Sequence, residues 1–248
     1  MPSIAVSPPG QPDIEYKPNR AKFEERGRRR KETEELPTTL PPGFPTKLDS
    51  PLAWKSEEVE NGTDWIYTLN DAQLVEIDDA LKAFKGLGLP LGYINQTTFP
   101  LPNLHGELRK LSKDLHLGRG FFVIRGLKVD DYTAEDNMII YCGVSSHVGD
   151  VRGRQQDTRF SNGKSLVVSH IKDLSRTEHA AEVGAPSNTA DKQVFHTDGG
   201  DLISLICLNP SVEGGESYIA SSWHVYNILA EKRPDLIWTL SENWPFDG

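Results

Sequence analysis

The feature that most constrains this chain is the segment 194–208, in which a His-x-Asp pair lies between two apolar runs. The run before the pair, Val194-Phe195, is typical of a β-strand, and the uncharged run 202–208 has the length and composition of a buried one. Asn209-Pro210 and Gly214-Gly215 then predict turns. The order strand, polar pair, buried strand and glycine-rich return indicates a core that contains β-structure.

His196 and Asp198 are the candidate metal ligands of this segment. Side chains at positions i and i+2 of a strand point to the same face, so the imidazole and the carboxylate can converge. Together they supply two of the three ligands of the 2-His-1-carboxylate triad, which holds Fe(II) and leaves positions open. The spacing alone is a weak signal: His105-Gly106-Glu107 has it too, in a segment with helical periodicity, where such side chains diverge.

Four stretches carry a resemblance to a known family. They are 120–127 (GFFVIRGL), 195–198 (FHTD), 213–217 (EGGES), and Tyr226 together with 233–236 (RPDL). In these stretches the chain resembles the TauD/TfdA family of Fe(II)/2-oxoglutarate-dependent dioxygenases, and its fungal members in particular. The resemblance covers roughly residue 65 to the end.

The resemblance implies both a site and a fold. It makes His196 and Asp198 iron ligands and places Ser217 where many members have a Thr that contacts 2-oxoglutarate. The implied reaction is oxidative hydroxylation of a small organic substrate by molecular oxygen, with decarboxylation of 2-oxoglutarate to succinate. The implied fold is α+β, with a double-stranded β-helix core (the jelly roll of clavaminate synthase-like proteins) and flanking helices.

The family's second iron-binding His and the Arg that binds the 2-oxoglutarate carboxylate lie well downstream of the matched stretches. We therefore expect a C-terminally truncated chain, with both residues beyond Gly248 and the later strands of the jelly roll missing. His224 and Arg233 loosely imitate the spacing of that pair. Because Ser221 or Ser222 can cap a helix through this stretch, we interpret His224 as a surface or packing residue.

Two alternatives from other functional classes stay open. The missing ligands would also suit a non-catalytic truncated product, or a pseudoenzyme that acts as a binding protein. A metal hydrolase that holds zinc with His196 and Asp198 is the other alternative, and it would act without oxygen or 2-oxoglutarate.

Charge and composition limit the partners. The net charge of -9 argues against nucleic acid, which needs a basic surface. No apolar run approaches the length of a membrane span, and no secretory signal follows Met1. Both cysteines lie in apolar patterns, so disulfides are not expected. These features predict a cytoplasmic protein that acts on a small molecule; they do not predict an oligomeric state.

Two regions are expected along the chain. Residues 1–46 are predicted to be a disordered, proline- and charge-rich tail, because residues 17–36 alone contain eight Lys or Arg and five Glu. Residues 47–248 are predicted to be the N-terminal part of the dioxygenase domain.

Local patterns predict several elements in this domain. Helices are expected at 71–85, between Asn70 and Gly86, at 103–115, and after a cap formed by Thr133 and Asp136. Buried strands are expected at 121–124 and 166–171, and a lid over the metal at 174–193.

Overall fold

A computed structural model describes residues 19–154, 166–175, 186–191 and 193–244 of the chain. Contacts between residues divide the chain into two units. One unit comprises residues 1–39 and 171–196, and the other comprises residues 40–170 and 197–248.

The first unit contains helix α1 (Arg20–Thr33) and the short 3-10 helix η4 (Pro186–Asn188). The side chain of Asn19 caps α1 by accepting a hydrogen bond from the Lys22 N–H, and no residue of α1 is buried. Two i,i+4 ion pairs, one of them between Arg20 and Glu24 at 2.8 Å, support this polar helix. The predicted disorder of residues 1–46 stays a prediction, and most of the predicted lid (176–185 and 192) lies outside the described residues.

The second unit holds most of the described secondary structure. Its elements are α2 (Ser56–Val59), β1 (Ile66–Thr68), α3 (Asp71–Leu87), η1 (Leu91–Tyr93), α4 (Leu104–Leu117), β2 (Val123–Arg125), η2 (Val129–Asp131), α5 (Ala134–Val148), α6 (Ser222–Lys232) and α7 (Pro234–Leu240).

Strands β1 and β2 form a two-stranded parallel sheet in which Ile66 lies beside Val123. β2 is shorter and less buried than expected, because the chain is regular only from Val123 to Arg125 and Val123 is exposed. Gly126 follows with φ of 110°, and a Cβ there would lie 3.2 Å from the Leu69 carbonyl oxygen. Glycine therefore lets the chain leave β2 close beside the end of β1.

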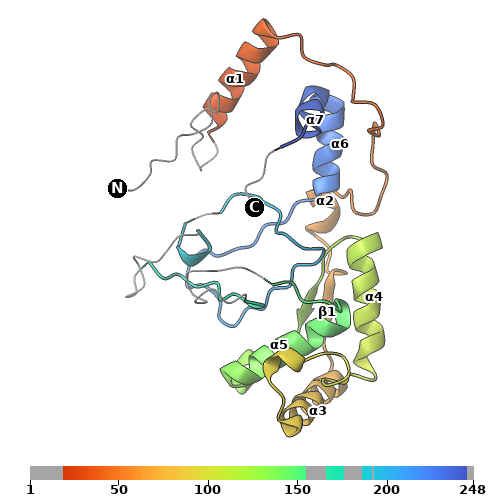
Figure 1. The fold of residues 1–248 in the computed structure, drawn as a ribbon, viewed down its shortest axis with the longest axis vertical. Helices are drawn as coiled ribbons and strands as arrows, with labels where there is room; N and C mark the ends of the chain where they lie inside the picture. Colours follow the sequence, from red (N-terminus) through yellow and green to blue (C-terminus); the bar gives the residue numbers. More distant parts are fainter. Residues whose placement is uncertain (1–18, 155–165, 176–185, 192, 245–248) are drawn as a thin grey trace. The chain divides into compact units, whose positions relative to one another are not determined.

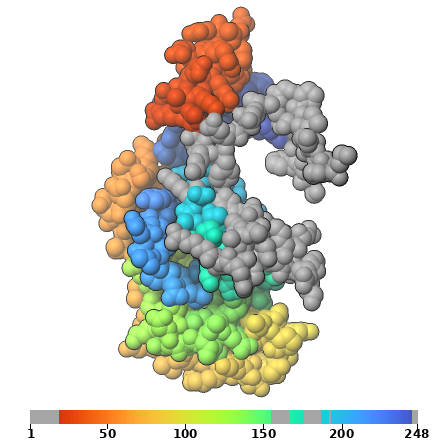
Figure 2. Space-filling model, turned by 90° about the vertical axis from the view of Figure 1, so that its left-hand side faces the viewer, coloured from red at the N-terminus to blue at the C-terminus, as the bar shows by residue number. Residues whose placement is uncertain are grey.

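Helices α3, α4 and α5 enclose the hydrophobic core next to this sheet (Figure 1). In Figure 2 the yellow and green surfaces of this part of the chain adjoin. The fully buried large side chains are Phe84, Phe99, Ile77, Ile94, Leu101, Leu104, Leu108, Ile139 and Ile140.

Local capping signals set most helix ends. Asn70 caps α3 in a capping box with Gln73, and the Thr133 side chain accepts from the Asp136 N–H at the start of α5, as predicted. The predicted stop at Gly86 was wrong: α3 continues to Leu87 and ends at Gly88, which has φ of 62°. The left-handed conformation, and not the first glycine in the sequence, ends the helix.

The predicted strands at 166–171 and 202–208 do not form in the structure. The only regular feature of the first is an isolated bridge at Leu166, and the second is irregular chain with several exposed apolar side chains. A strand is completed by hydrogen bonds to a neighbour, and no described residue pairs with the backbone of 202–208 in this way. Apolar composition alone was therefore insufficient to predict these elements.

Helices α6 and α7 complete the second unit. Ser221 caps α6, as predicted, by accepting a hydrogen bond from the His224 N–H. Asn227 accepts from the Leu48 N–H at 2.6 Å and donates to the Leu48 carbonyl at 3.0 Å. Tyr226 donates its hydroxyl to the Pro45 carbonyl at 2.6 Å. In the part of the chain that the structure describes, no helix is long and apolar enough to cross a membrane.

Candidate functional site

His196 lies in irregular chain at the end of the first unit, with an exposed side chain. Its Nδ1 is 2.8 Å from the Val194 carbonyl oxygen. A carbonyl can only accept, so Nδ1 carries the proton and the lone pair of a neutral imidazole lies on Nε2. Metal-ligating histidines commonly use this arrangement, in which one nitrogen donates to the protein and the other binds the metal.

Asp198 lies in the second unit, is exposed, and is followed by two glycines. Gly199 has no atom within 4 Å of an added Cβ, and Gly200 adopts φ of 146°, which favours glycine. The two residues that follow Asp198 therefore carry no side chain, and Gly200 has a backbone conformation that favours glycine.

Ser217 is the predicted 2-oxoglutarate contact, and it is exposed in the coil before α6. Two consecutive glycines in the left-handed region precede it, Gly214 with φ of 70° and Gly215 with φ of 80°. The bend of this stretch lies at residues 212–213, just before the glycines at which the turn was predicted.

The convergence of the predicted ligands stays a prediction, because His196 belongs to one unit while Asp198 and Ser217 belong to the other. Among the described residues, no group of three or more His, Cys, Asp or Glu side chains is arranged to hold a metal ion.

His224 and Arg233, the loose imitation of the family's distal pair, have other roles in the described structure. The guanidinium of Arg233 makes two hydrogen bonds of 2.8 Å to the buried carboxylate of Asp235, and this pairing raises the pKa of Arg233. His224 lies half-buried in the first turn of α6. Because the Arg233 fork is already engaged, it is poorly suited to bind a second carboxylate.

A pair of histidines that the sequence did not reveal joins α4 to α5. The Nδ1 atoms of His105 and His147 are 2.9 Å apart, and His147 Nε2 is 2.8 Å from the Phe99 carbonyl oxygen. That carbonyl requires a proton on His147 Nε2, so His147 Nδ1 accepts and His105 Nδ1 donates. Burial lowers the pKa of His147, and the facing His105 adds to this effect. The two residues are 42 positions apart, so spacing gave no signal.

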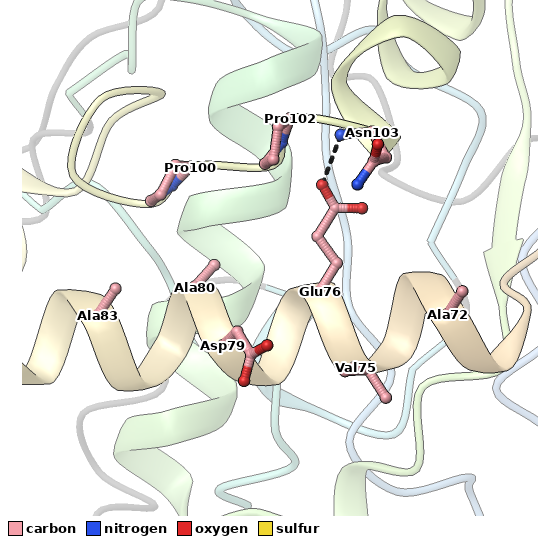
Figure 3. Close-up of a pocket in the computed structure, with 9 residues that line it drawn as sticks. All are labelled: Ala72, Val75, Glu76, Asp79, Ala80, Ala83, Pro100, Pro102 and Asn103. Atoms are coloured by element: carbon pink, nitrogen blue, oxygen red, sulfur yellow. Dashed lines mark hydrogen bonds between the residues drawn. The ribbon is translucent and has the colours of Figure 1, made fainter.

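A shallow groove of about 490 Å³ runs between α3 and the segment 100–103 (Figure 3). Alanine, valine and proline side chains line most of it, together with Glu76 and Asp79. Glu76 accepts hydrogen bonds from the backbone of Asn103 and Leu104, so it caps the start of α4, and Asp79 pairs with Lys82 at 3.1 Å. With both carboxylates engaged and no histidine or cysteine in its lining, this groove lacks the chemistry of an iron site.

A family profile described as "Taurine catabolism dioxygenase TauD, TfdA family" matches residues 84–247. The chain belongs to the TauD/TfdA family. The resemblance expected from the sequence motifs is confirmed, and it includes the stretch with His196, Asp198 and Ser217. The family is one of oxidoreductases that generally use Fe(II) and 2-oxoglutarate.

Two relatives of this TauD/TfdA chain are informative. A taurine hydroxylase-like protein, SAT17, from Stachybotrys chartarum is 37% identical over 207 residues, which are 82% of this chain and 52% of that protein. FR-33289 synthase from Streptomyces rubellomurinus is 24% identical over 184 residues, which are 74% of this chain and 52% of that protein. The chain thus spans about half the length of the curated relatives it matches.

The side chains of His196 and Asp198 are of the types that bind Fe(II) in 2-His-1-carboxylate triads. One neutral imidazole and one carboxylate are the ligand types of the iron triad, and the hydrogen bond to Val194 directs the imidazole lone pair to Nε2. His196 and Asp198 are two candidate ligands, where the triad has three.

Proposed function

We propose that this chain is part of an Fe(II)/2-oxoglutarate-dependent dioxygenase that hydroxylates a small organic molecule. The observation that carries the proposal is the His196-Thr197-Asp198 motif inside the stretch that matches the TauD/TfdA family. The relative from Stachybotrys chartarum supports the same class, since it is named as taurine hydroxylase-like.

His196 would bind the iron through Nε2, and Asp198 would bind it through its carboxylate and offset part of the metal's charge. An iron ion held by these residues would supply the oxidising chemistry that hydroxylates a substrate C–H bond, with oxygen and 2-oxoglutarate consumed and succinate and carbon dioxide formed. The Ser217 hydroxyl would donate a hydrogen bond to a 2-oxoglutarate carboxylate and so orient it. Gly199 and Gly200 would leave space for small ligands beside the metal.

The remaining elements of the proposal concern the fold. We propose that residues 47–248 form the N-terminal part of a jelly-roll dioxygenase domain and that residues 1–46 are a tail. The third protein ligand and the Arg for 2-oxoglutarate are proposed to lie outside this sequence. We also propose a cytoplasmic location, on the basis of the apolar runs and cysteines of the sequence. No observation on the described residues favours a non-catalytic binding protein or a zinc hydrolase.

Metal binding tests the ligand assignment. Anaerobic Fe(II) titration should show that His196→Ala and Asp198→Ala each weaken binding by about tenfold or more, because each removes a ligand. The matched controls are His116→Ala and Asp201→Ala, which remove exposed side chains of the same types. Equal iron affinities for the wild type and the two ligand variants would overturn the site.

Turnover tests the reaction. Succinate formation should be slow in this chain and faster in a version extended through a distal His and Arg, because two protein ligands define the iron geometry incompletely. Ser217→Ala should raise the 2-oxoglutarate concentration needed for half-maximal turnover in the extended version. Equal rates for the two lengths would show that residues within this sequence complete the site.

A further inference from the structure

The chain that follows the candidate ligand Asp198 is held by one side of α5. Tyr141 donates its hydroxyl to the Ser204 carbonyl at 2.6 Å, and the hydroxyls of Ser145 and Ser204 are 3.2 Å apart. The Leu202 side chain lies against the end of the same helix, since its Cδ1 is 3.2 Å from a Cβ added at Gly149. Positions 141, 145 and 149 follow one another at intervals of four residues, so they lie along one side of α5 and its C-cap.

Another side of α5 is fixed in the core. A Cβ added at Gly143 would overlap the ring of Phe99, and His147 is bonded to the Phe99 carbonyl at 2.8 Å. At the end of the helix, the Val148 carbonyl accepts a hydrogen bond from the Ser112 hydroxyl at 2.7 Å. Helix α5 is therefore held in place independently of its contacts with residues 202–204.

The contacts with α5 fix a segment that has few others. Within the part of the chain that the structure describes, the two bonds at Ser204 are the only hydrogen bonds that join 199–220 to another segment. The next residue bonded in this way is Ser221, which donates to the Leu52 carbonyl. The contacts with α5 therefore shorten the free chain after Asp198 from more than twenty residues to four.

A shorter tether confines the Asp198 carboxylate to a smaller volume. Four residues span at most about 14 Å, and the effective concentration of a tethered group falls as its tether lengthens. Confinement before the metal arrives removes part of the ordering cost that binding would otherwise include.

We propose that Tyr141 and Ser145 are positioning residues for the candidate iron site. By holding Ser204, they keep the Asp198 carboxylate within reach of one place beside α5. The inference rests on the proposed function, because it concerns an iron ligand of that proposal. Both residues act through Ser204, and neither is a ligand itself.

The size of the effect follows from the strength of one hydrogen bond. A ligand that is correctly placed for only part of the time gives an affinity reduced by that fraction. Loss of one hydrogen bond changes such a population by about two- to tenfold. Tyr141→Phe should therefore weaken Fe(II) binding about threefold, and Tyr141→Phe combined with Ser145→Ala should weaken it further.

Proteolysis of the metal-free chain tests whether the contacts hold the segment. Chymotrypsin cleavage after Leu205, the neighbour of Ser204, should be about threefold faster in Tyr141→Phe, because cleavage follows the population of the detached segment. Tyr226→Phe is the matched control, since it removes a hydroxyl bond of the same length, 2.6 Å, to the backbone carbonyl of Pro45. Equal cleavage rates after Leu205 in the wild type and both variants would overturn the proposal.

Anaerobic Fe(II) titration in a double-mutant cycle tests the positioning role. Tyr141→Phe should weaken iron binding in the wild-type background, whereas Tyr226→Phe should leave it unchanged. In an Asp198→Ala background, Tyr141→Phe should have no further effect, because the tyrosine acts through that carboxylate.

Two further outcomes separate this inference from the proposed function. An equal loss of iron affinity in both backgrounds, or no loss in either, would overturn the positioning role while leaving Asp198 as a ligand. Equal iron affinities of the wild type and Asp198→Ala would overturn the proposed site, and the positioning role with it.

Discussion

At the scale of single residues, burial controls the ionisation of His147, because it lowers the pKa of the imidazole. His147 is 2% exposed, donates from Nε2 to Phe99 and accepts at Nδ1 from His105. A proton added at His147 Nδ1 would meet the N–H of His105, so this pair holds His147 neutral.

The stability of the chain should therefore fall as the pH drops below about 6.5, the usual pKa of histidine. The folded pKa of His147 is lowered, so the unfolded chain binds more protons there. This contribution is fully present above the unfolded pKa and is lost as the pH falls, at up to about 1.4 kcal/mol per pH unit. Urea unfolding at about pH 7.5 and pH 5.5 measures it.

His147→Gln is the control for this prediction, because its amide can still donate to the Phe99 carbonyl but does not titrate. The variant should be less stable overall, yet it should lose less stability between the two pH values than the wild type does. Identical losses in the two proteins would show that other groups cause the pH dependence.

At the scale of elements, the two glycines near the end of α3 should respond to alanine with opposite signs. Gly88 has φ of 62°, so Gly88→Ala should cost about 1 kcal/mol in the free energy of unfolding. Gly86 lies inside the helix with nothing within 4 Å of an added Cβ, so Gly86→Ala should stabilise the protein by about 0.5–1 kcal/mol. Denaturant unfolding of both variants measures this, and destabilisation by Gly86→Ala would place the end of α3 earlier.

The elements also show how far sequence patterns reach. The caps at Asn70, Thr133 and Ser221 were predictable, because each partner lies within three residues of its cap. Strand formation depends on a distant partner: β2 pairs with β1, more than 50 residues earlier, whereas 202–208 pairs with no described strand. Composition could not distinguish these two cases.

The candidate site shows the same limit. The family stretch and the ligand types of His196 and Asp198 were predictable, because they lie within a few consecutive residues. Contacts between distant parts of the chain, such as the ion pair of Lys85 with Asp136 at 2.6 Å and the pair of His105 with His147, left no local pattern.

At the scale of the whole molecule, the segment 197–220 differs from the parts of the second unit that precede and follow it. Nearly all of its residues are exposed and it contains no helix or strand, whereas the residues before it form the core around α3, α4 and α5. The residues after it form α6, which is hydrogen-bonded to residues 45–52 through Ser221, Tyr226 and Asn227. Local unfolding of residues 197–220 therefore breaks few contacts, whereas local unfolding of the core helices or of α6 breaks many.

Limited chymotrypsin digestion of the dilute chain should therefore cut first within the second unit at exposed sites such as Leu205 and Tyr218, which are 70% and 73% exposed. The two fragments should remain together in gel filtration, since the bonds between α6 and residues 45–52 do not involve the cleaved segment. Asn227→Ala should make the nicked fragments separate more readily, because it removes both bonds to Leu48. Cleavage inside α3, α4 or α5 before 197–220, or separation of the wild-type fragments at once, would show that stability is distributed differently in the second unit.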